Sequence, residues 1–584
     1  MNALEKELLF LVETHLQCIY DDKAFPDVDN TALAKKLITL FDLDEKCLKP
    51  AVHESLWDEK DVLSITYGDS IIKDGEPPLK TLKHFFDDHL KDTLSGIHIL
   101  PFFPYSSDDG FSVIDYTQVN DGLGDWSYIE DIAKKYDLMA DLVVNHCSSR
   151  SRWFDNFKQR KEPGKSYFFE APADTDTSMV VRPRTSPLLR EVETLDGKKH
   201  VWCTFSHDQV DLNFANPDVL CEMVNIIRLY LDRGVKIFRM DAVAFIWKEL
   251  NHSSIHHPKT HEIIRLMRTL IEHHSPDAII ITETNVPNVE NLSYFGNANE
   301  AHAVYNFSLP PLLIHALITG DCTHLKHWQM SMPPAQEGTF YFNFIASHDG
   351  IGLRPAEGFL NEEEINTVIN SVQQTGARVS WRTDDSGNKK AYEINVTLFD
   401  ALAGTVSGPD KWQNERFICA HGVMLALEGI PAFYIHSLLA TQNYQEGVEL
   451  TGSNRTINRY KWDRDEIENK LAQPHTHHAK IFTELKRLIE IRREQSAFHP
   501  NATSFTLHLG NQLFGFWRQS IKRTQSIFCI FNFSDEEVTI PLSSINLVDV
   551  TKWVDLVSGD AFTDMHQDLT FKPYQFIWLS NKWQ

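Results

Sequence analysis

Short apolar runs recur along the chain, and each is followed by a stretch with helical character. Continuous apolar runs that alternate with helices are typical of parallel strands covered on both faces. The runs occupy residues 62–68, 96–103, 138–146, 235–243, 278–285, 302–309, 339–349 and 429–437. Eight such units predict an α/β fold, namely a (β/α)8 TIM barrel.

The intervals between the runs are uneven, which predicts insertions in the barrel. About 90 residues separate the third run from the fourth, too many for one loop and one helix. They include the proline- and charge-rich segment VVRPRTSPLLREVETLDGKKHVW, so we expect an inserted domain over 148–215. A second insertion, 353–415, contains RTDDSGNKK. Barrel enzymes build their sites from loops of this kind.

The two ends of the chain differ from the barrel pattern. Residues 1–60 begin with an amphipathic stretch and are expected to form a helical extension. The barrel itself is then expected over 61–147 and 216–499. After a predicted helix at 481–495, short alternating strands such as SFTLHLGNQLFGFWRQ take over. This change predicts an antiparallel β domain over 500–584.

Charge and composition exclude several classes of partner. The chain has 56 Lys and Arg against 81 Asp and Glu, a net charge of −25, which repels nucleic acids and anionic membranes. Acidic residues interrupt the apolar N-terminal stretch, unlike a signal peptide, and no run of about 18 apolar residues occurs. The eight cysteines are scattered without CxxC spacing, as expected of reduced thiols in the cytoplasm.

Metal and cofactor sites are not expected. The histidine groups HHPKTH (256–261) and HTHH (475–478) have no carboxylate-and-cysteine constellation around them, and we expect them to be exposed rather than to bind metal.

Carboxylates stand at the ends of three predicted strands. Asp241 ends the fourth run, Glu283 the fifth and Asp349 the seventh; His146 ends the third, and Arg239 lies beside Asp241. A purely structural role is the alternative for these residues: Asp241 could cap a helix, Arg239 could pair with any carboxylate, and HDG is a common turn. Strand ends of a barrel meet at one mouth, however, so together these side chains predict an active site.

Retaining glycoside transfer is the chemistry that needs such a group. One ionised carboxylate attacks the anomeric carbon, while a second protonates the leaving oxygen and later activates the acceptor. We expect Arg239 to keep Asp241 ionised and oriented. Glu283, flanked by isoleucines, is expected to have the raised pKa of a general acid.

Longer motifs identify a family resemblance. The segments DLVVNH (141–146), FRMDAV (238–243), ITET (281–284) and ASHDG (346–350) resemble those of the α-amylase superfamily. The segments LPFFPYSSDDGFSVIDY (100–116), GDWSYIE (124–130), SHDGIG (347–352) and RTINR (455–459) resemble its sucrose phosphorylase subfamily. Together these matches span most of residues 60–500.

The resemblance implies a role for each matching residue. Asp241 would be the nucleophile, Glu283 the acid/base and Asp349 the carboxylate that grips sugar hydroxyls. Asp108 and Arg459 would close a glucose pocket, with Arg455 as the competing arginine. His146 and His348 would contact hydroxyls, and Phe111 would form an apolar platform. The second substrate would be inorganic phosphate, the product α-glucose 1-phosphate, and no calcium or cofactor would be needed.

Two departures bear on the leaving group. The subfamily pattern has a histidine two positions after the acid/base, where this chain has Asn285. Arg354 and Glu357 follow HDGIG on a loop that should border the acceptor site; Arg354 could hold phosphate or a carboxylate, or simply pair with Glu357. These features look more like relatives that phosphorolyse glucosylglycerate.

Four functions stay open at this point. A phosphorylase of sucrose ranks first and one of glucosylglycerate second. A hydrolase or transglucosidase could use the same three acids, and a non-catalytic amylase-like barrel would be a binding subunit. The partners we expect are a small sugar and inorganic phosphate, with no nucleic acid and no membrane, for a cytoplasmic monomer or homodimer.

Overall fold

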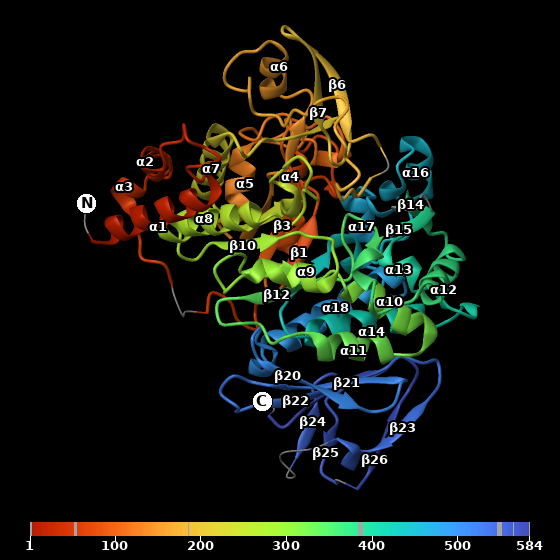
Figure 1. Cartoon of the computed structure of the whole chain (residues 1–584). Coiled ribbons are helices and arrows are strands. Elements are labelled where there is room, and N and C mark those ends of the chain that lie inside the picture. Colours follow the sequence, from red (N-terminus) through yellow and green to blue (C-terminus); the bar gives the residue numbers. More distant parts are fainter. Residues whose placement is uncertain are drawn as a thin grey trace.

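The computed structural model describes residues 3–51, 55–184, 186–383, 389–545, 552–564 and 566–582. Its centre is a closed barrel of parallel strands, confirming the predicted fold (Figure 1). The strands are β1 (Leu63–Thr66), β3 (Gly96–Ile99), β4 (Asp137–Val143), β9 (Val235–Asp241), β10 (Ile279–Thr282), β11 (Ala303–Tyr305), β12 (Phe340–Asn343) and β18 (Ile430–Tyr434). Each lies within one of the eight apolar runs or starts one residue before it, because strands buried on both faces have no polar face.

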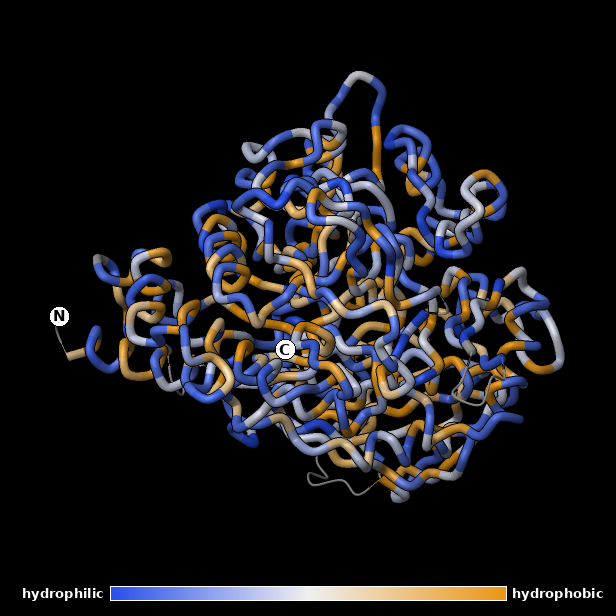
Figure 2. The backbone as a smooth tube through the Cα atoms, turned by 45° about the horizontal axis from the view of Figure 1, so that its top comes forward, coloured by the Kyte–Doolittle hydropathy of each residue, from blue (hydrophilic) through white to orange (hydrophobic). Residues whose placement is uncertain are grey.

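Helices surround the barrel. They are α4 (Pro78–His89), α5 (Trp126–Ala133), α7 (Pro217–Asp232), α8 (Pro258–His274), α10 (Leu309–Thr319), α11 (Thr323–Ser331), α14 (Gln413–Ala426) and α18 (His477–Arg493). Hydrophobic and hydrophilic segments alternate along the outer coils of the chain in Figure 2, as expected of helices buried on one face, whereas every residue of α10 except Thr319 is buried.

The N-terminal segment forms three helices beside the barrel. They are α1 (Ala3–Ile19), α2 (Asn30–Leu40) and α3 (Leu43–Lys46). The first packs against α8 and the second against α7 (Figure 1). His15 of α1 makes a 2.6 Å contact with the Glu262 carboxylate on α8, which adds a polar tie to the apolar packing.

Two insertions rise at the mouth of the barrel. The first contains α6 (Arg152–Lys158) and the hairpin of β6 (Leu189–Thr194) and β7 (Gly197–Trp202); β5 (His146–Ser148) pairs with β8 (Gln209–Asp211) at its base. The second contains β13 (Ile351–Gly352), α12 (Glu362–Gln373), β14 (Arg378–Thr383) and β15 (Lys389–Asn395), and part of its RTDDSGNKK segment, 384–388, lies outside the described residues. The precise domain boundaries stay predictions.

The C-terminal segment is an antiparallel β unit, as predicted. Its main sheet has the order β20 (Thr503–His508), β21 (Leu513–Gln519), β22 (Ser526–Asn532), β27 (Phe576–Ser580), β24 (Trp553–Asp555) and β25 (Ala561–Phe562). A smaller sheet pairs β23 (Val538–Pro541) with β26 (Asp568–Phe571). This unit lies at the side of the barrel away from the first insertion (Figure 1).

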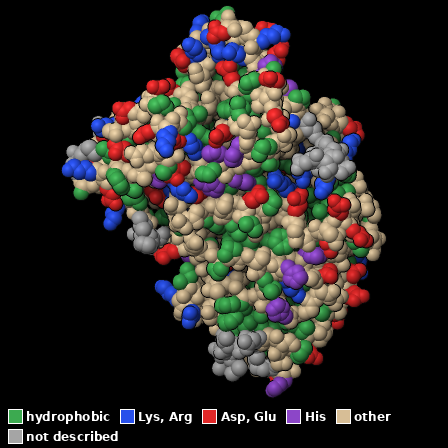
Figure 3. All heavy atoms as spheres, in the orientation of Figure 1, with side chains coloured by type: hydrophobic (Ala, Val, Ile, Leu, Met, Phe, Trp, Pro, Cys, Tyr) green, Lys and Arg blue, Asp and Glu red, His purple; other side chains and the backbone are tan. Residues whose placement is uncertain are grey.

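The charged side chains on the surface are consistent with the composition of the chain. Acidic and basic side chains are interspersed over the visible face (Figure 3). No helix in the described part of the chain is long and apolar enough to cross a membrane. All eight cysteines are free thiols.

Candidate active site

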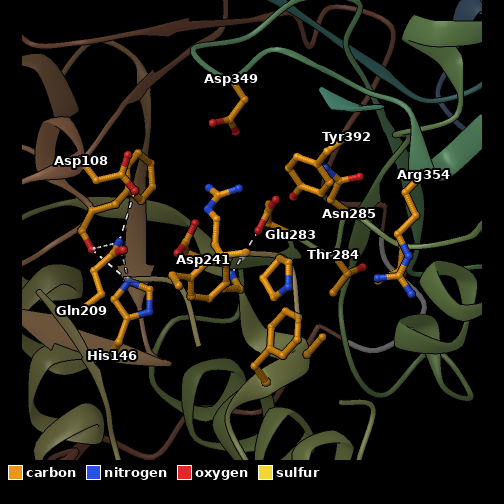
Figure 4. A pocket seen from close by; sticks show the side chains of 18 of the residues that line it. Asp108, His146, Gln209, Asp241, Glu283, Thr284, Asn285, Asp349, Arg354 and Tyr392 are labelled. Atoms are coloured by element: carbon orange, nitrogen blue, oxygen red, sulfur yellow. Dashed lines mark hydrogen bonds between the residues drawn. The ribbon is translucent and has the colours of Figure 1, made fainter. Parts of the chain in front are cut away.

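Eight of the ten predicted site residues line one pocket at the barrel mouth (Figure 4). They are Asp108, Phe111, His146, Asp241, Glu283, His348, Asp349 and Arg354. The strand ends bring them together: Asp241 is the last residue of β9, Glu283 follows β10, and His146 opens β5 just after β4. Arg239 and Arg459 do not line the pocket but lie behind its wall.

Arg239 contacts both central carboxylates. Its Nη1 donates to Asp241 Oδ1 at 2.9 Å and to the buried carboxylate of Asp141, and its Nη2 lies 3.8 Å from Glu283 Oε1. The charged pair predicted on the fourth strand is therefore present, and it orients Asp241. Since Arg239 is only 2% exposed, the three carboxylates are also what makes its burial tolerable.

Opposing effects act on the pKa of Asp241. Burial raises the pKa of Asp241 well above its ordinary value and Glu283 raises it further, although Arg239 lowers it. Burial is the largest of these effects, and Asp141, which shares the same guanidinium nitrogen of Arg239, also raises the pKa of Asp241. Burial also raises the pKa of Glu283, with Asp349 adding to the shift, as expected of a general acid. Two neighbouring carboxyls with raised pKa values titrate as a pair.

Asp349 has the opposite environment. Its Oδ1 lies 2.7 Å from Arg455 Nη1 and its Oδ2 lies 3.4 Å from His348 Nε2. Burial alone would raise the pKa of Asp349, but the positive charges of Arg455 and Arg459 lower it, so this carboxylate stays ionised. Gly350 of the HDG segment packs closely against β15, because a Cβ at this position would come within 2.6 Å of the Ile394 carbonyl oxygen.

The two competing arginines take different places. Arg455 lines the pocket, and Glu393 of β15 holds its guanidinium at 2.8 and 3.1 Å. Arg459 instead donates to the His348 carbonyl at 2.9 Å and pairs with Asp109. Arg455 thus lines the pocket, while Arg459 lies behind its wall with Nη2 4.0 Å from Asp349 Oδ1, and its role at the closed end stays a prediction.

The remaining predicted residues form the other side of the pocket. His146 Nε2 donates to the Phe111 carbonyl at 3.0 Å, with Asn145 bonding its Nδ1 at 3.1 Å. The Phe111 ring lies in the pocket wall and stacks on His348 with 5.0 Å between ring centroids. Burial lowers the pKa of His348 to about 3, so this ring stays neutral at working pH.

The lining residues that the sequence reasoning missed include Gln209, Arg184 and Tyr392. Gln209 of β8 donates to Asp108 Oδ2 at 3.2 Å. Arg184 of the first insertion lies over the ring of Tyr392, on β15 of the second, at 5.6 Å. The segment RPR around Arg184 was a visible basic signal, but nothing in the sequence tells which insertion residues reach the barrel mouth.

Arg354 lies across the pocket from Asp108 and His146 (Figure 4). The alternative role predicted for Arg354, an ion pair with Glu357, is wrong, because Glu357 pairs with Arg382 at 3.0 Å instead. Within the described residues, neither Arg354 nor Arg184 makes an ion pair with a carboxylate. Both guanidinium groups belong to residues that line the pocket.

A family model confirms what this geometry indicates. The model "Alpha amylase, catalytic domain" matches residues 88–350, and "Maltogenic Amylase, C-terminal domain" matches 505–578. The chain belongs to the α-amylase family.

Individual relatives show which members of the family this chain resembles. A glucosylglycerate phosphorylase of Spirochaeta thermophila is 41% identical over 90% of both chains. A sucrose phosphorylase of Streptococcus mutans is 27% identical over 74% of this chain and 87% of its own. The crystal structure of sucrose 6F-phosphate phosphorylase from Thermoanaerobacter thermosaccharolyticum superposes with a TM-score of 0.70 at 25% identity, covering 81% of this chain and 94% of that one.

Proposed function

We propose that this protein is a retaining α-glucoside phosphorylase that converts glucosylglycerate and phosphate into α-glucose 1-phosphate and glycerate. The observation that carries the choice of substrate is the 41% identity to a glucosylglycerate phosphorylase, against 27% to a sucrose phosphorylase. The sequence alone ranks sucrose first; the relatives support the second choice better.

The reaction proceeds in two displacements. Asp241 attacks the anomeric carbon and forms a covalent glucosyl ester, while Glu283 gives its proton to the departing glycerate oxygen. Phosphate then attacks the same carbon from the face that glycerate left, and Glu283 takes the proton of the attacking phosphate. Two inversions give net retention, and Glu283 ends in its starting state.

The charges around the pair set this division of roles. Because the pKa values of Asp241 and Glu283 are both raised in a shared buried space, one proton is readily held between them. We assign the proton to Glu283, since Arg239 donates directly to Asp241 Oδ1 at 2.9 Å but lies 3.8 Å from Glu283. The backbone N–H of Ala242 donates to Glu283 Oε2 at 3.1 Å and fixes its orientation.

The closed end of the pocket is suited to one glucose ring. Asp349 and Asp108 offer carboxylate acceptors for sugar hydroxyls, and Arg455 offers a donor between them. Burial would raise the pKa of Asp108, but Arg455 and Arg459 lower it, so both acceptors are ionised. Ionised Asp349 also stabilises the positive charge that develops on the ring in the transition state.

The open end is suited to anions. Arg184 and Arg354 are lining residues without a carboxylate partner in the described chain, in a protein whose net charge of −25 disfavours anions elsewhere. Planar guanidinium groups bind carboxylates and phosphates by paired hydrogen bonds. Glycerate carries a carboxylate and the second substrate is phosphate, so the same two arginines can serve both half-reactions.

A substrate panel tests the proposal. The enzyme is incubated with phosphate and, separately, sucrose, sucrose 6-phosphate, glucosylglycerol or glucosylglycerate, and glucose 1-phosphate is measured over time. We expect the largest kcat/KM for glucosylglycerate and no product when phosphate is omitted. Faster turnover of sucrose would return the assignment to a sucrose phosphorylase, and phosphate-independent release of glucose would identify a hydrolase.

A further inference from the structure

A cluster of metal-ligand type lies on the outer helices, apart from the pocket. His315 of α10, His324 of α11 and Glu364 of α12 each offer one ligand atom, and these atoms lie within 4.8 Å of one another. The three residues are too far apart in sequence to belong to one turn, since 49 positions separate His315 from Glu364. Packing of α10 against both α11 and α12 brings them together.

Local structure orients the carboxylate of the cluster. Glu364 is the third residue of α12 and takes part in a capping box with Asn361. Its Oε2 accepts from the Asn361 backbone N–H at 2.8 Å, while its Oε1 accepts from His324 Nε2 at 2.7 Å. Outer partners of this kind commonly fix a carboxylate for coordination. The carboxylate therefore has one oxygen anchored by the helix and the other facing the histidines.

His315 is the residue of this cluster whose hydrogen-bonding capacity is least used. The residue is 5% exposed, and its Nδ1 is buried without a hydrogen-bond partner in the described structure. Its ring centroid lies 5.3 Å from that of His324. An unpartnered buried ring nitrogen is the feature that a hydrogen-bonded surface pair does not explain.

The donor set matches a particular class of ion. Two imidazoles and one carboxylate are typical ligands of Zn²⁺, at distances of about 2.0–2.2 Å. Ligand atoms at such distances around a tetrahedral ion lie about 3.4 Å apart, so His324 and Glu364 need to separate by less than 1 Å from their hydrogen-bonded positions. Since the three ligand atoms lie within 4.8 Å of one another, the remaining adjustment is a closer approach of the side chains, and water would complete the coordination.

We propose that His315, His324 and Glu364 bind a divalent transition-metal ion, with Zn²⁺ as the best match, and that the ion clamps α12 to the α10–α11 pair. This site was not predicted from the sequence, which pointed only to the groups at 256–261 and 475–478. In the first of those, His256 and His261 instead contact Glu290 and Glu300 at 3.0 and 2.7 Å. The clamp bears on the pocket, since α12 follows the loop that carries Arg354.

Zinc binding by matched variants tests the site. The chelator-treated protein is titrated with ZnCl2 by calorimetry, and bound zinc is counted after dialysis by mass spectrometry. We expect one ion per chain for the wild type and for His327→Asn, an exposed histidine on the same helix α11. His315→Asn, His324→Asn and Glu364→Gln should each weaken binding by about tenfold or more, as loss of a ligand requires.

Two further readouts keep the test decisive if a variant folds poorly. Zinc should raise the melting temperature of the wild type and of His327→Asn but not of a folded ligand variant. In the wild type, Co²⁺ should give visible absorption bands of a tetrahedral nitrogen and oxygen site. Failure of the wild type to bind Zn²⁺, lack of such bands, or equal binding by all variants (an adventitious ion only) would overturn the proposal. None of these outcomes depends on the proposed phosphorylase activity.

Discussion

The two ends of the active-site pocket are built differently. At the closed end, His146 and Asp349 follow barrel strands, and each is hydrogen-bonded or ion-paired to a neighbour. At the open end, Arg184 and Arg354 come from the two insertions and have no carboxylate partner among the described residues. Figure 4 shows the contrast, with Asp108, Gln209 and His146 on one side of the carboxylates and Arg354 on the other.

In the proposed function, the difference between the two ends separates two tasks of the site. The closed end must hold one sugar ring against reacting carboxylates, which requires side chains already fixed by their neighbours. The open end must admit the leaving group and then phosphate, which requires groups whose hydrogen-bonding capacity is still unused. A barrel with the same closed end could therefore serve different leaving groups through changes in its insertions alone.

The largest expected effect is at the centre of the closed end. Asp241→Asn should reduce turnover of every substrate on the order of 10⁴-fold or more, because no covalent intermediate can form. Steady-state kinetics with the natural substrate and with α-glucosyl fluoride measures this loss. Asp137→Asn, at the start of β4 and so at the opposite end of the barrel, should keep near-normal activity; loss in both variants would point to general unfolding.

Glu283→Gln should slow the reaction of glucosylglycerate much more than that of glucosyl fluoride. Glycerate needs a proton to leave and fluoride does not, so the first half-reaction should fall by about 10²–10⁴-fold with glucosylglycerate but little with glucosyl fluoride. Burst kinetics of fluoride and glycerate release measures the two rates. Equal losses on both substrates would remove Glu283 from the role of general acid.

Arg354→Ala tests the open end. The KM for phosphate or glucosylglycerate should rise about 10- to 100-fold, the range expected when one charge-assisted pair is lost. The first step on glucosyl fluoride should change little, because fluoride makes no use of the anion site. Arg184→Ala should behave similarly.

Arg382→Ala is the matched control for both arginines, since Arg382 belongs to the same insertion as Arg354 but pairs with Glu357 outside the pocket. Unchanged KM values in the two pocket variants would leave the open end without an anion site. The proposed difference in function between the two ends of the pocket would then be lost.

The smallest effect concerns stability. Folding raises the pKa of Glu283, so the folded state holds its proton more tightly than the unfolded chain does. This contribution to stability is present below the unfolded pKa of about 4.3 and is lost as pH rises through the folded pKa. Glu283→Gln should therefore raise the melting temperature near neutral pH, on the order of 1 °C or more, and raise it less at pH 4. A lower melting temperature of the variant at pH 7 would contradict the raised pKa.

The sequence predicted the barrel well because one signal repeats at every strand. Strands such as β9 are buried on both faces, and continuous apolar runs record that burial directly. The acids were predictable for a related reason: Asp241 and Glu283 interrupt or end such runs, and a charge in a buried strand needs a partner or a chemical role.

The arginines show where the sequence was insufficient. Arg455 and Arg459 are four positions apart around the short helix η5 (Asn454–Asn458), and their motif does not tell which one faces the sugar. The ion pair of Arg455 with Glu393, a residue 62 positions away on β15, decides it. The sequence likewise shows Arg239 beside Asp241 but does not show that Asp141, on the neighbouring strand β4, accepts a hydrogen bond from the same guanidinium nitrogen.

By itself, then, the sequence determined the strands, the antiparallel C-terminal unit and the three acids at the barrel mouth, since each follows from local burial patterns or from residues that directly follow a strand. Only the tertiary structure decided which insertion residues reach the pocket, which arginine faces it, and that His315, His324 and Glu364 come together. These are contacts between segments distant in sequence, and their geometry depends on how whole helices and loops pack, which no local pattern encodes.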